Sequence, residues 1–442
     1  MPKVCDLGKG EGKLKHQEIG RRMARIAVAG ALTCGIAAIA VGAGPAYASG
    51  ATTRYVGATA GRDTGCGSPG YTSVQAAVNA AKPGDTVYLC GTTPFPGPVD
   101  VTKSVTLTGS AGATISAPTT WPTSAGPLPP QFASDGLFAP QALVLAWGQG
   151  VHATIKGLTI AGPLPGNGGC AEQDFGILVI GGASAQITGD AVTNIRDADS
   201  ALYGCQYGVG IMIGREYWPT ANFSTDKVED FAGSATIRHT TVSGYQKGGI
   251  VIDGPKASAV VSDSTVAGAG PYSALGKIIA QNGIQVSRGA FAQVLDNTVS
   301  GNQYSGGGAA SSAGVLLYGG CGDPLVKNVS VAGNTLTNND VGAELSNSDP
   351  SCANPPSTKT DDVVAGNRIS DSAVTNTSGA STTPLCGYQA GVQDFGSHDV
   401  ITENHVSGTG YLNHPTCTTA QPYITYPIDT TGSLDPLVIF NS

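Results

Sequence analysis

A short segment of the form aliphatic-x-x-(Asn, Asp, Ser or Thr)-x-aliphatic recurs seven times along this chain of 442 residues. The copies span residues 187–192, 237–242, 261–266, 294–299, 331–336, 364–369 and 401–406, with an earlier variant at 155–160. Their fourth residues lie 24 to 50 residues apart, and four of the intervals are 33 or 37 residues. Such intervals are typical of proteins that stack one coil of strands on the next. The repeat therefore predicts an all-β solenoid in which each copy belongs to one rung.

Each rung also carries a second strand that begins with glycine. These strands begin at Gly176, Gly210, Gly249, Gly283, Gly314, Gly342 and Gly391. Because side chains alternate along a strand, we expect the second and fourth residues of each to point inward. The polar residues at the bends of the first segment are expected to point inward as well and to bond the backbone of the next rung. This predicts structural roles for Asn297, Asn334, Asn367 and Asn404.

The first 48 residues have the pattern of a secretory signal peptide. Arg21, Arg22 and Arg25 precede an uncharged run over 26–44, and Ala46-Tyr47-Ala48 supplies the small residues of a cleavage site. Met23 is an alternative start, and a membrane anchor is disfavoured because the run is rich in Ala and Gly. We therefore expect a secreted, extracellular or wall-associated protein. Its mature domain would span 49–442, with rungs over about 86–410 and a C-terminal cap over 411–442.

The mature chain is acidic. Of the 23 basic and 31 acidic residues, seven and three lie in residues 1–48, so 16 and 28 remain and the net charge is −12. Because a phosphate backbone would be repelled by this charge, we expect no nucleic-acid partner. We also expect a monomer without a membrane span after processing.

Eight cysteines remain in the mature chain, and an even number in an exported protein indicates disulfides. Eight cysteines allow 105 pairings. Cys170 and Cys205 precede the equivalent strand positions Ile177 and Ile211 by seven and six residues. Since neighbouring rungs are about 4.8 Å apart, equivalent positions are within disulfide reach. The same reasoning pairs Cys321 with Cys352 and Cys386 with Cys417, leaving Cys66 with Cys90. The alternative of a zinc site lacks ligands at the usual spacing.

Residues 71–81 have apolar positions at helical spacing and end at Lys82-Pro83-Gly84-Asp85, which predicts a short amphipathic helix covering the first rung. The segment SVQAAVNAAKPGDTVYL, followed by VTKSVTLTG and the Asn-bearing rungs, resembles the exported right-handed parallel β-helix proteins of the pectin-lyase-like superfamily. The resemblance covers residues 71–410. It implies a single-stranded right-handed parallel β-helix and recognition of an extracellular polysaccharide. If the protein is an enzyme, it favours a polysaccharide lyase over a glycoside hydrolase.

A polar column precedes the second strands and is the first candidate site. Its members are Asp174, Gly208, Lys247, Gln281, Ser312, Asp340 and Gln389. Lys247 would remove the C5 proton of a uronate with Asp174 as its catalytic companion, and Glu172, Asp197 and Asp199 would hold Ca²⁺ against the substrate carboxylate. The alternative is that the column consists of solvated turn residues.

A row of tyrosines in the following loops is the second candidate site. The rings of this row would stack against sugar rings, and Lys277 nearby would supply hydrogen bonds. The row consists of Tyr245, Tyr272 and Tyr304, with Tyr411 further on. The alternative is that these rings pack half-buried over the turns.

Two further observations bear on function. The insertion over 215–233 is rich in aromatic residues, and we expect it to cover the apolar outward positions Leu178, Met212 and Val251. The catalytic motifs of polygalacturonases, pectin methylesterases and alginate epimerases are absent from the sequence. The alternative function is therefore that of a non-catalytic structural or adhesive surface solenoid.

Overall fold

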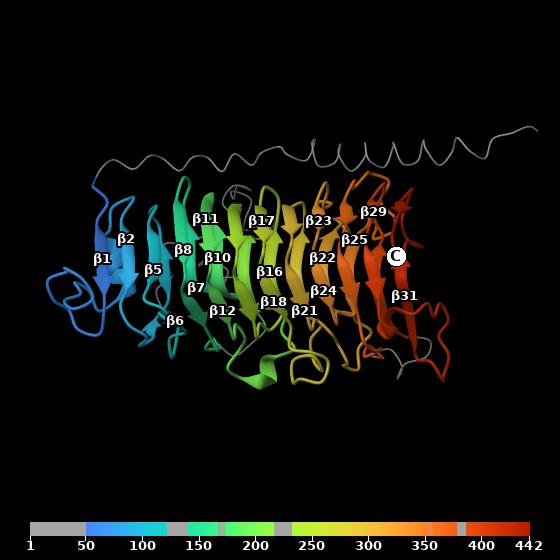
Figure 1. The fold of residues 1–442 in the computed structure, drawn as a ribbon, viewed down its shortest axis with the longest axis horizontal. Coiled ribbons are helices and arrows are strands. Elements are labelled where there is room, and N and C mark those ends of the chain that lie inside the picture. Colours follow the sequence, from blue (N-terminus) through green and yellow to red (C-terminus); the bar gives the residue numbers. More distant parts are fainter. Residues whose placement is uncertain are drawn as a thin grey trace, which may run out of the picture. The chain divides into compact units, whose positions relative to one another are not determined.

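The computed structural model describes residues 50–121, 140–166, 170, 173–215, 232–353, 355–377 and 386–442. The predicted signal peptide lies outside these residues. The domain over Ser49–Ser442 consists of three parallel sheets whose strands stack rung upon rung (Figure 1). The predicted all-β parallel solenoid is confirmed.

Sheet 1 has twelve strands, in stacking order β1 (Thr53–Val56), β2 (Thr86–Leu89), β5 (Thr106–Gly109), β8 (His152–Lys156), β11 (Ala183–Thr188), β14 (Gly233–Arg238), β17 (Ser258–Ser262), β20 (Phe291–Leu295), β23 (Ser330–Ala332), β26 (Val363–Ala365), β29 (Val400–Thr402) and β32 (Leu437–Ile439). Sheet 2 has ten strands, β4 (Val99–Val101), β7 (Pro140–Trp147), β10 (Gln173–Ile180), β13 (Val209–Gly214), β16 (Gly248–Asp253), β19 (Asn282–Ser287), β22 (Ala313–Gly319), β25 (Val341–Asn347), β28 (Gly387–Asp394) and β31 (Tyr423–Asp429). Sheet 3 also has ten strands, β3 (Phe95–Pro96), β6 (Thr114–Ser116), β9 (Thr159–Ala161), β12 (Ala191–Thr193), β15 (Thr241–Ser243), β18 (Thr265–Ala267), β21 (Thr298–Ser300), β24 (Thr335–Thr337), β27 (Arg368–Ser370) and β30 (His405–Ser407).

The bend between sheets 1 and 3 is held by an asparagine ladder. The backbone N of Asn297 donates to Oδ1 of Asn334 (2.9 Å), and that of Asn334 donates to Oδ1 of Asn367 (2.9 Å). The amide of Asn334 also donates to the Val294 carbonyl oxygen at 2.9 Å. The predicted structural role of these residues is confirmed, because each ladder member satisfies backbone groups that the bend buries.

The interior is filled by columns of aliphatic side chains at equivalent rung positions. One column in sheet 1 consists of Ile155, Ile187, Ile237, Val261, Val294, Val331, Val364 and Ile401, all fully buried. The glycine that begins each second strand permits close stacking in sheet 2. A Cβ added at Gly283 would lie 2.6 Å from the carbonyl oxygen of Gly314 on the next rung, so only glycine fits there.

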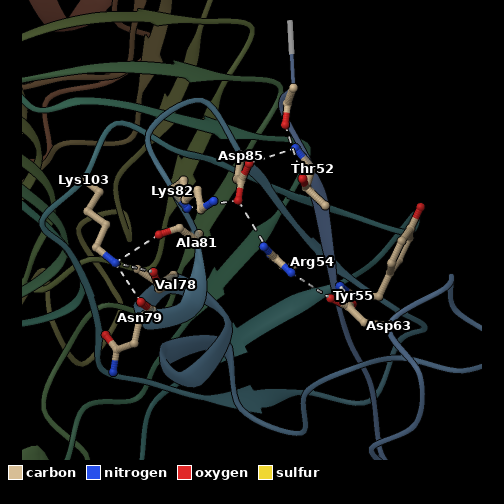
Figure 2. A network of polar contacts seen from close by, with 11 residues as sticks. Thr52, Arg54, Tyr55, Asp63, Val78, Asn79, Ala81, Lys82, Asp85 and Lys103 are labelled. Atoms are coloured by element: carbon tan, nitrogen blue, oxygen red, sulfur yellow. Dashed lines mark hydrogen bonds and ion pairs between the residues drawn. The ribbon is translucent and has the colours of Figure 1, made fainter. Parts of the chain in front are cut away.

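Helix α2 (Val74–Ala80) covers the first rungs, as predicted. Ser73 accepts a hydrogen bond from the Ala76 N at the helix N-terminus, and Val74, Ala77 and Val78 are buried in the core. At the other end, Nζ of Lys103 donates to the carbonyl oxygens of Asn79 (2.7 Å) and Ala81 (3.0 Å). Figure 2 shows this contact beside a second one, in which the buried Asp85 accepts from the backbone N of Thr52 (2.8 Å) and Lys82 (2.9 Å). Lys103 thus fixes the end of the helix to the turn between β4 and β5, and Asp85 fixes the segment after the helix to the residue before β1.

Four disulfides join the predicted pairs. They are Cys66 with Cys90, Cys170 with Cys205, Cys321 with Cys352 and Cys386 with Cys417, and their Cα atoms lie 4.3 to 6.1 Å apart. The register argument holds because Ile177 and Ile211 do face each other in β10 and β13. Within the described residues, no helix has the length and apolar character needed to cross a membrane.

The stack continues beyond Gly410, where the sequence pattern fades. Strand β31 pairs with β28, and β32 pairs with β29. Asn441 extends the asparagine ladder, since its Oδ1 accepts from the backbone N of Asn404 at 2.9 Å. Residues Val438 to Ser442 thus match the first five positions of the repeat, 37 residues after the copy that begins at Ile401. Short 3₁₀ turns lie at Ser200–Leu202 and Thr409–Tyr411.

Candidate functional site

The structure does not bring the predicted catalytic pair together. Asp174 and Lys247 occupy equivalent positions two rungs apart, a separation of about 9.6 Å along the stack. Asp174 is fully buried. Nζ of Lys247 donates to the Ala280 carbonyl oxygen at 2.7 Å, on the rung that lies away from Asp174. Lys247 is therefore positioned to act with later rungs, and not with Asp174.

The rest of the polar column is buried and hydrogen-bonded, contrary to the alternative of solvated turns. The backbone N of Gln281 donates to Oγ of Ser312 (3.0 Å), and that of Ser312 donates to Oδ2 of Asp340 (2.9 Å). Gln281, Ser312, Asp340 and Gln389 are all fully buried. These side chains join rungs at the turn before sheet 2, which leaves Lys247 as the half-exposed member that can face a ligand.

The predicted calcium ligands make local contacts. Asp197 is buried, and its carboxylate accepts from the backbone N of Asp199 (2.6 Å) and from the Tyr207 hydroxyl (3.0 Å). Asp199 accepts from the Ala201 N at 2.9 Å and so caps a 3₁₀ turn. Glu172 lies outside the described residues, and the part of the chain that is described has no group of three or more His, Cys, Asp or Glu residues suited to a metal ion. Calcium binding stays a prediction.

Most of the predicted tyrosine row belongs to the core. Tyr245 is fully buried and donates its hydroxyl hydrogen to Oδ1 of Asn302 at 2.5 Å, and burial raises its pKa far above the ordinary value. Tyr304 and Tyr411 are also buried. The loops fold back over the turns, so these rings cannot stack on a sugar. Tyr272, which is 73% exposed, and the exposed Lys277 remain accessible.

The outward face of sheet 2 changes character along the stack. One outward position per rung forms a column in register, namely Leu178, Met212, Val251, Gln285, Leu316, Glu344, Gln393 and Asp429. The first three are apolar and buried, as predicted, while the insertion over 216–231 lies outside the described residues. From β19 onward the column is mostly polar. We call the outward side chains Asn282, Gln285, Glu344, Tyr388, Gln393 and Tyr426 the polar face.

Lys247 and Glu344 bring titratable groups to this face. Both are half-buried. Loss of hydration lowers the pKa of Lys247 to about 8, although the charge of Glu344 opposes this shift. Loss of hydration also raises the pKa of Glu344 to about 7, against the charge of Lys247 and a hydrogen bond from Ser346. Each group can therefore gain or lose a proton near neutral pH.

Two tyrosines adjoin Glu344 at the end of the face. The Tyr388 hydroxyl donates to Oδ2 of Asp429 at 2.7 Å, and the Tyr388 and Tyr426 ring centroids are 6.3 Å apart. Oδ1 of Asp429 accepts from the backbone N and the hydroxyl of Thr431, at 3.1 and 2.8 Å. Burial, followed by the contact with Asp429, raises the pKa of Tyr388. Both rings are thus held in place as half-buried planar surfaces.

The amides of β19 are also oriented by hydrogen bonds. Nδ2 of Asn282 donates to Oε1 of Gln285 (2.9 Å), and Nε2 of Gln285 donates to the Ser287 hydroxyl (3.0 Å). The hydroxyl of Ser287 donates in turn to Asp253 at 2.8 Å. A fixed row of amide and aromatic groups on a rigid sheet is suited to a ligand with many hydroxyl groups. The third residue of each glycine-led strand, Gln285, Glu344 and Gln393, was the sequence signal for this face.

One family model and several solved structures are similar to this chain. Residues 142–354 match a family model described as the right handed beta helix region. An alginate lyase from Paenibacillus sp. str. FPU-7 is 12% identical, and the alignment covers 86% of this chain and 99% of the lyase chain, with a TM-score of 0.43. A lacto-N-biosidase from Eubacterium ramulus is 12% identical over 88% of this chain and 67% of its own, with a TM-score of 0.45. A surface adhesin of Streptococcus pneumoniae is 13% identical over 75% and 80%, with a TM-score of 0.41.

No curated protein matches the chain. Together, the three stacked parallel sheets and the family match define the class of fold: the chain is a parallel β-helix, and its residues 142–354 match the right handed beta helix region. The parallel β-helix that the resemblance implied is thereby confirmed.

Proposed function

We propose that the protein recognises an extracellular polysaccharide on the polar face. The observation that carries this proposal is the in-register change of the outward column of sheet 2, from Val251 to the amide of Gln285 and on to Glu344 and Gln393. Amides and carboxylates bond sugar hydroxyls, and the faces of Tyr388 and Tyr426 suit the apolar side of a sugar ring. The predicted signal peptide and the four disulfides support an oxidising compartment outside the cytoplasm.

A binding experiment with matched variants tests this proposal. We expect Gln285→Ala and Tyr426→Ala to weaken binding of a glycan ligand at least tenfold, about 1.4 kcal/mol each, because each removes a contact of the polar face. Affinity electrophoresis of residues 49–442 through immobilised polysaccharides would measure this. Gln186→Ala is the control, since Gln186 is an exposed glutamine on β11 of sheet 1. If a glycan retards all three variants equally, it binds elsewhere on the protein. If none of the glycans retards the wild-type protein, a structural or adhesive solenoid is favoured.

Lys247 favours a second candidate, a uronate lyase. A lysine whose pKa is about 8 is partly neutral near that pH and can remove the C5 proton, while protonated Glu344 can donate to the leaving oxygen. We expect the rate of uronate elimination to be highest between pH 7 and 8 and to fall on either side, because Lys247 must be neutral and Glu344 protonated, and we expect Lys247→Ala to reduce the rate at least 100-fold. Absorbance of the unsaturated uronate product measures the rate. The exposed Lys156, on β8 of sheet 1, provides the control Lys156→Ala. If Lys247→Ala leaves the rate unchanged, or if no uronate polymer yields an unsaturated product, the lyase is excluded.

A further inference from the structure

The cations on the outward side of sheet 2 determine which glycans the polar face can hold. The described residues place Lys247 and Arg288 there as half-exposed cations, and the buried Arg215 follows β13 in register with Arg288. Nη1 of Arg288 lies 3.1 Å from each carboxylate oxygen of Asp253, and its Nε lies 3.3 Å from Oδ2 of Asp323. The guanidinium carbon is also 5.6 Å from the centre of the Tyr318 ring. Two carboxylates therefore already balance the charge of Arg288.

Lys247 is the other half-exposed cation, and its charge interacts with that of Glu344. A polyuronate carries one carboxylate per sugar, and each needs a positive charge or a bound cation to offset its lost hydration. Beyond Lys247, the outward positions of β22, β25, β28 and β31 that form the column are Leu316, Glu344, Gln393 and Asp429. A chain of uronates along this column would meet carboxylates where it requires cations.

The undescribed segments cannot reverse this balance. Residues 122–139, 167–169, 171–172, 216–231, 354 and 378–385 contain one basic residue, Lys227. They contain six acidic residues, namely Asp135, Glu172, Glu216, Asp226, Glu229 and Asp230. Wherever these segments lie, they carry one positive and six negative charges, which are part of the net charge of −12 of the mature chain. Long-range attraction of a polyanion is therefore excluded as well.

A positively charged glycan also lacks counter-charges on this face. Both carboxylate oxygens of Asp429 accept hydrogen bonds, one from Tyr388 and the other from Thr431. Asp253 is engaged by Ser287 and Arg288. Glu344 alone remains, and it faces the charge of Lys247. Repeated ammonium groups would thus find one partly balanced carboxylate along the described part of the column.

We propose that the polar face selects an uncharged polysaccharide, held by the amides of Asn282, Gln285 and Gln393 and by the rings of Tyr388 and Tyr426. This inference rests on the proposed function and names its class of ligand. It also has a chemical consequence. Without a carboxylate at C6 the C5 proton is not acidic, so a face that selects uncharged glycans does not belong to a uronate lyase.

Calorimetry with three sets of oligosaccharides tests the inference. The sets are neutral glucans, xylans, mannans and galactans; polygalacturonate and alginate; and chitosan. We expect binding from the neutral set, with affinity changing less than about twofold between low and high salt, because no ion pair is screened. Glu344→Gln removes the charge and keeps a polar contact, so it should weaken binding less than Gln285→Ala, which should reduce the affinity at least tenfold.

Two outcomes would overturn the inference and leave the proposed function standing. These are tighter binding of a uronate or chitosan oligosaccharide than of every neutral one, or an affinity that falls more than tenfold with salt or with Glu344→Gln. Binding from none of the three sets would refute the proposed function itself and the inference with it. Thermal unfolding of each variant, measured alongside, separates a lost contact from a lost fold.

Discussion

The protein is expected to lose stability as the pH rises from 5 to 9, because buried carboxyl groups in its last rungs hold protons that the unfolded chain releases. Asp394 and Asp399 are fully buried, and one carboxylate oxygen of each has no hydrogen-bond donor among the described residues. We infer that the two groups share a proton, because the two carboxyl groups interact with each other. Burial, and then the charge of Asp394, raises the pKa of Asp399 to about 8.

Among the residues that the structure describes, no cation forms an ion pair with Asp394 or Asp399. Asp399 accepts from the Thr360 hydroxyl (2.7 Å) and the backbone N of Asp362 (2.7 Å), and Asp394 accepts from the backbone N of Gly396 (2.7 Å). The nearby Asp362 is itself fully buried, and burial together with the charge of Asp399 raises its pKa. His398 on the adjoining turn faces Asp435, with 3.8 Å between Nε2 and Oδ2. Ionisation of the pair would therefore leave adjacent buried negative charges.

The sign of the effect follows from proton binding. The unfolded Asp399 titrates near 3.8 and the folded one near 8, so the folded state binds more protons between these values and the free energy of unfolding falls as the pH rises through this window. Asp190 and Asp371, each with a pKa raised to about 6 mainly by burial, act in the same direction. A substitution at Asp399 separates its contribution to this pH dependence from those of Asp190 and Asp371.

Asp399→Asn should stabilise the protein at pH 9 by at least about 2 kcal/mol and flatten its pH dependence. The asparagine retains the oxygen that Thr360 and Asp362 need, and its amide donates permanently to Asp394. Urea unfolding at pH 5, 7 and 9 measures the difference. Asp263→Asn is the control, since Asp263 is exposed. A wild-type protein equally stable at all three pH values, or an Asp399→Asn variant with the wild-type slope, would contradict the shared proton.

Removal of one ladder asparagine should have the second large effect. Asn334→Ala leaves the backbone N of Asn297 and the carbonyl oxygen of Val294 without their side-chain partners in a fully buried bend. Since each unsatisfied buried group costs about 1–3 kcal/mol, we expect a loss of about 3–5 kcal/mol in the free energy of unfolding. Urea unfolding at constant pH would measure it.

The ladder itself supplies a graded comparison. Ser264 occupies the same bend position, and its hydroxyl oxygen accepts from the backbone N of Thr240 at 3.2 Å. Asn334→Ser should therefore retain an acceptor for Asn297 and cost less than Asn334→Ala. Thr335→Ala, on the outward side of the next strand, should stay within about 0.5 kcal/mol of the wild type. Equal stability of the alanine and serine variants would show that hydrogen bonding is not what the position requires.

The sequence was sufficient to predict features that repeat from rung to rung. The bend residues Asn297 and Asn334 and the pairing of Cys170 with Cys205 follow from register alone, because parallel strands place equivalent positions side by side. The same logic would have found Asn441, which lies 37 residues after Asn404, the interval that separates Asn367 from Asn404. Repetition makes such contacts predictable without knowledge of the loops.

The candidate site was less predictable, because it depends on how loops and side chains are directed. Tyr245 is buried since its loop folds inward to reach Asn302, and nothing in the spacing of the tyrosines indicates that direction. Lys247 was identified, but its orientation towards Ala280 and not towards Asp174 follows from side-chain placement. The alternation of its strand places Glu344 outward, but its position beside Gln393 follows only from the register between rungs.

The outward column of sheet 2 also places side chains at regular intervals. Its positions recur at about 4.8 Å along the stack, and each is separated from the interior by its own strand. Exchanging Gln285 and Leu316 would move an amide by one such step and leave the inward neighbours Ile284 and Val315 in place. The spacing between chemical groups on this surface can therefore be rewritten in fixed increments, which makes the protein a scaffold on which the register of a long ligand can be designed.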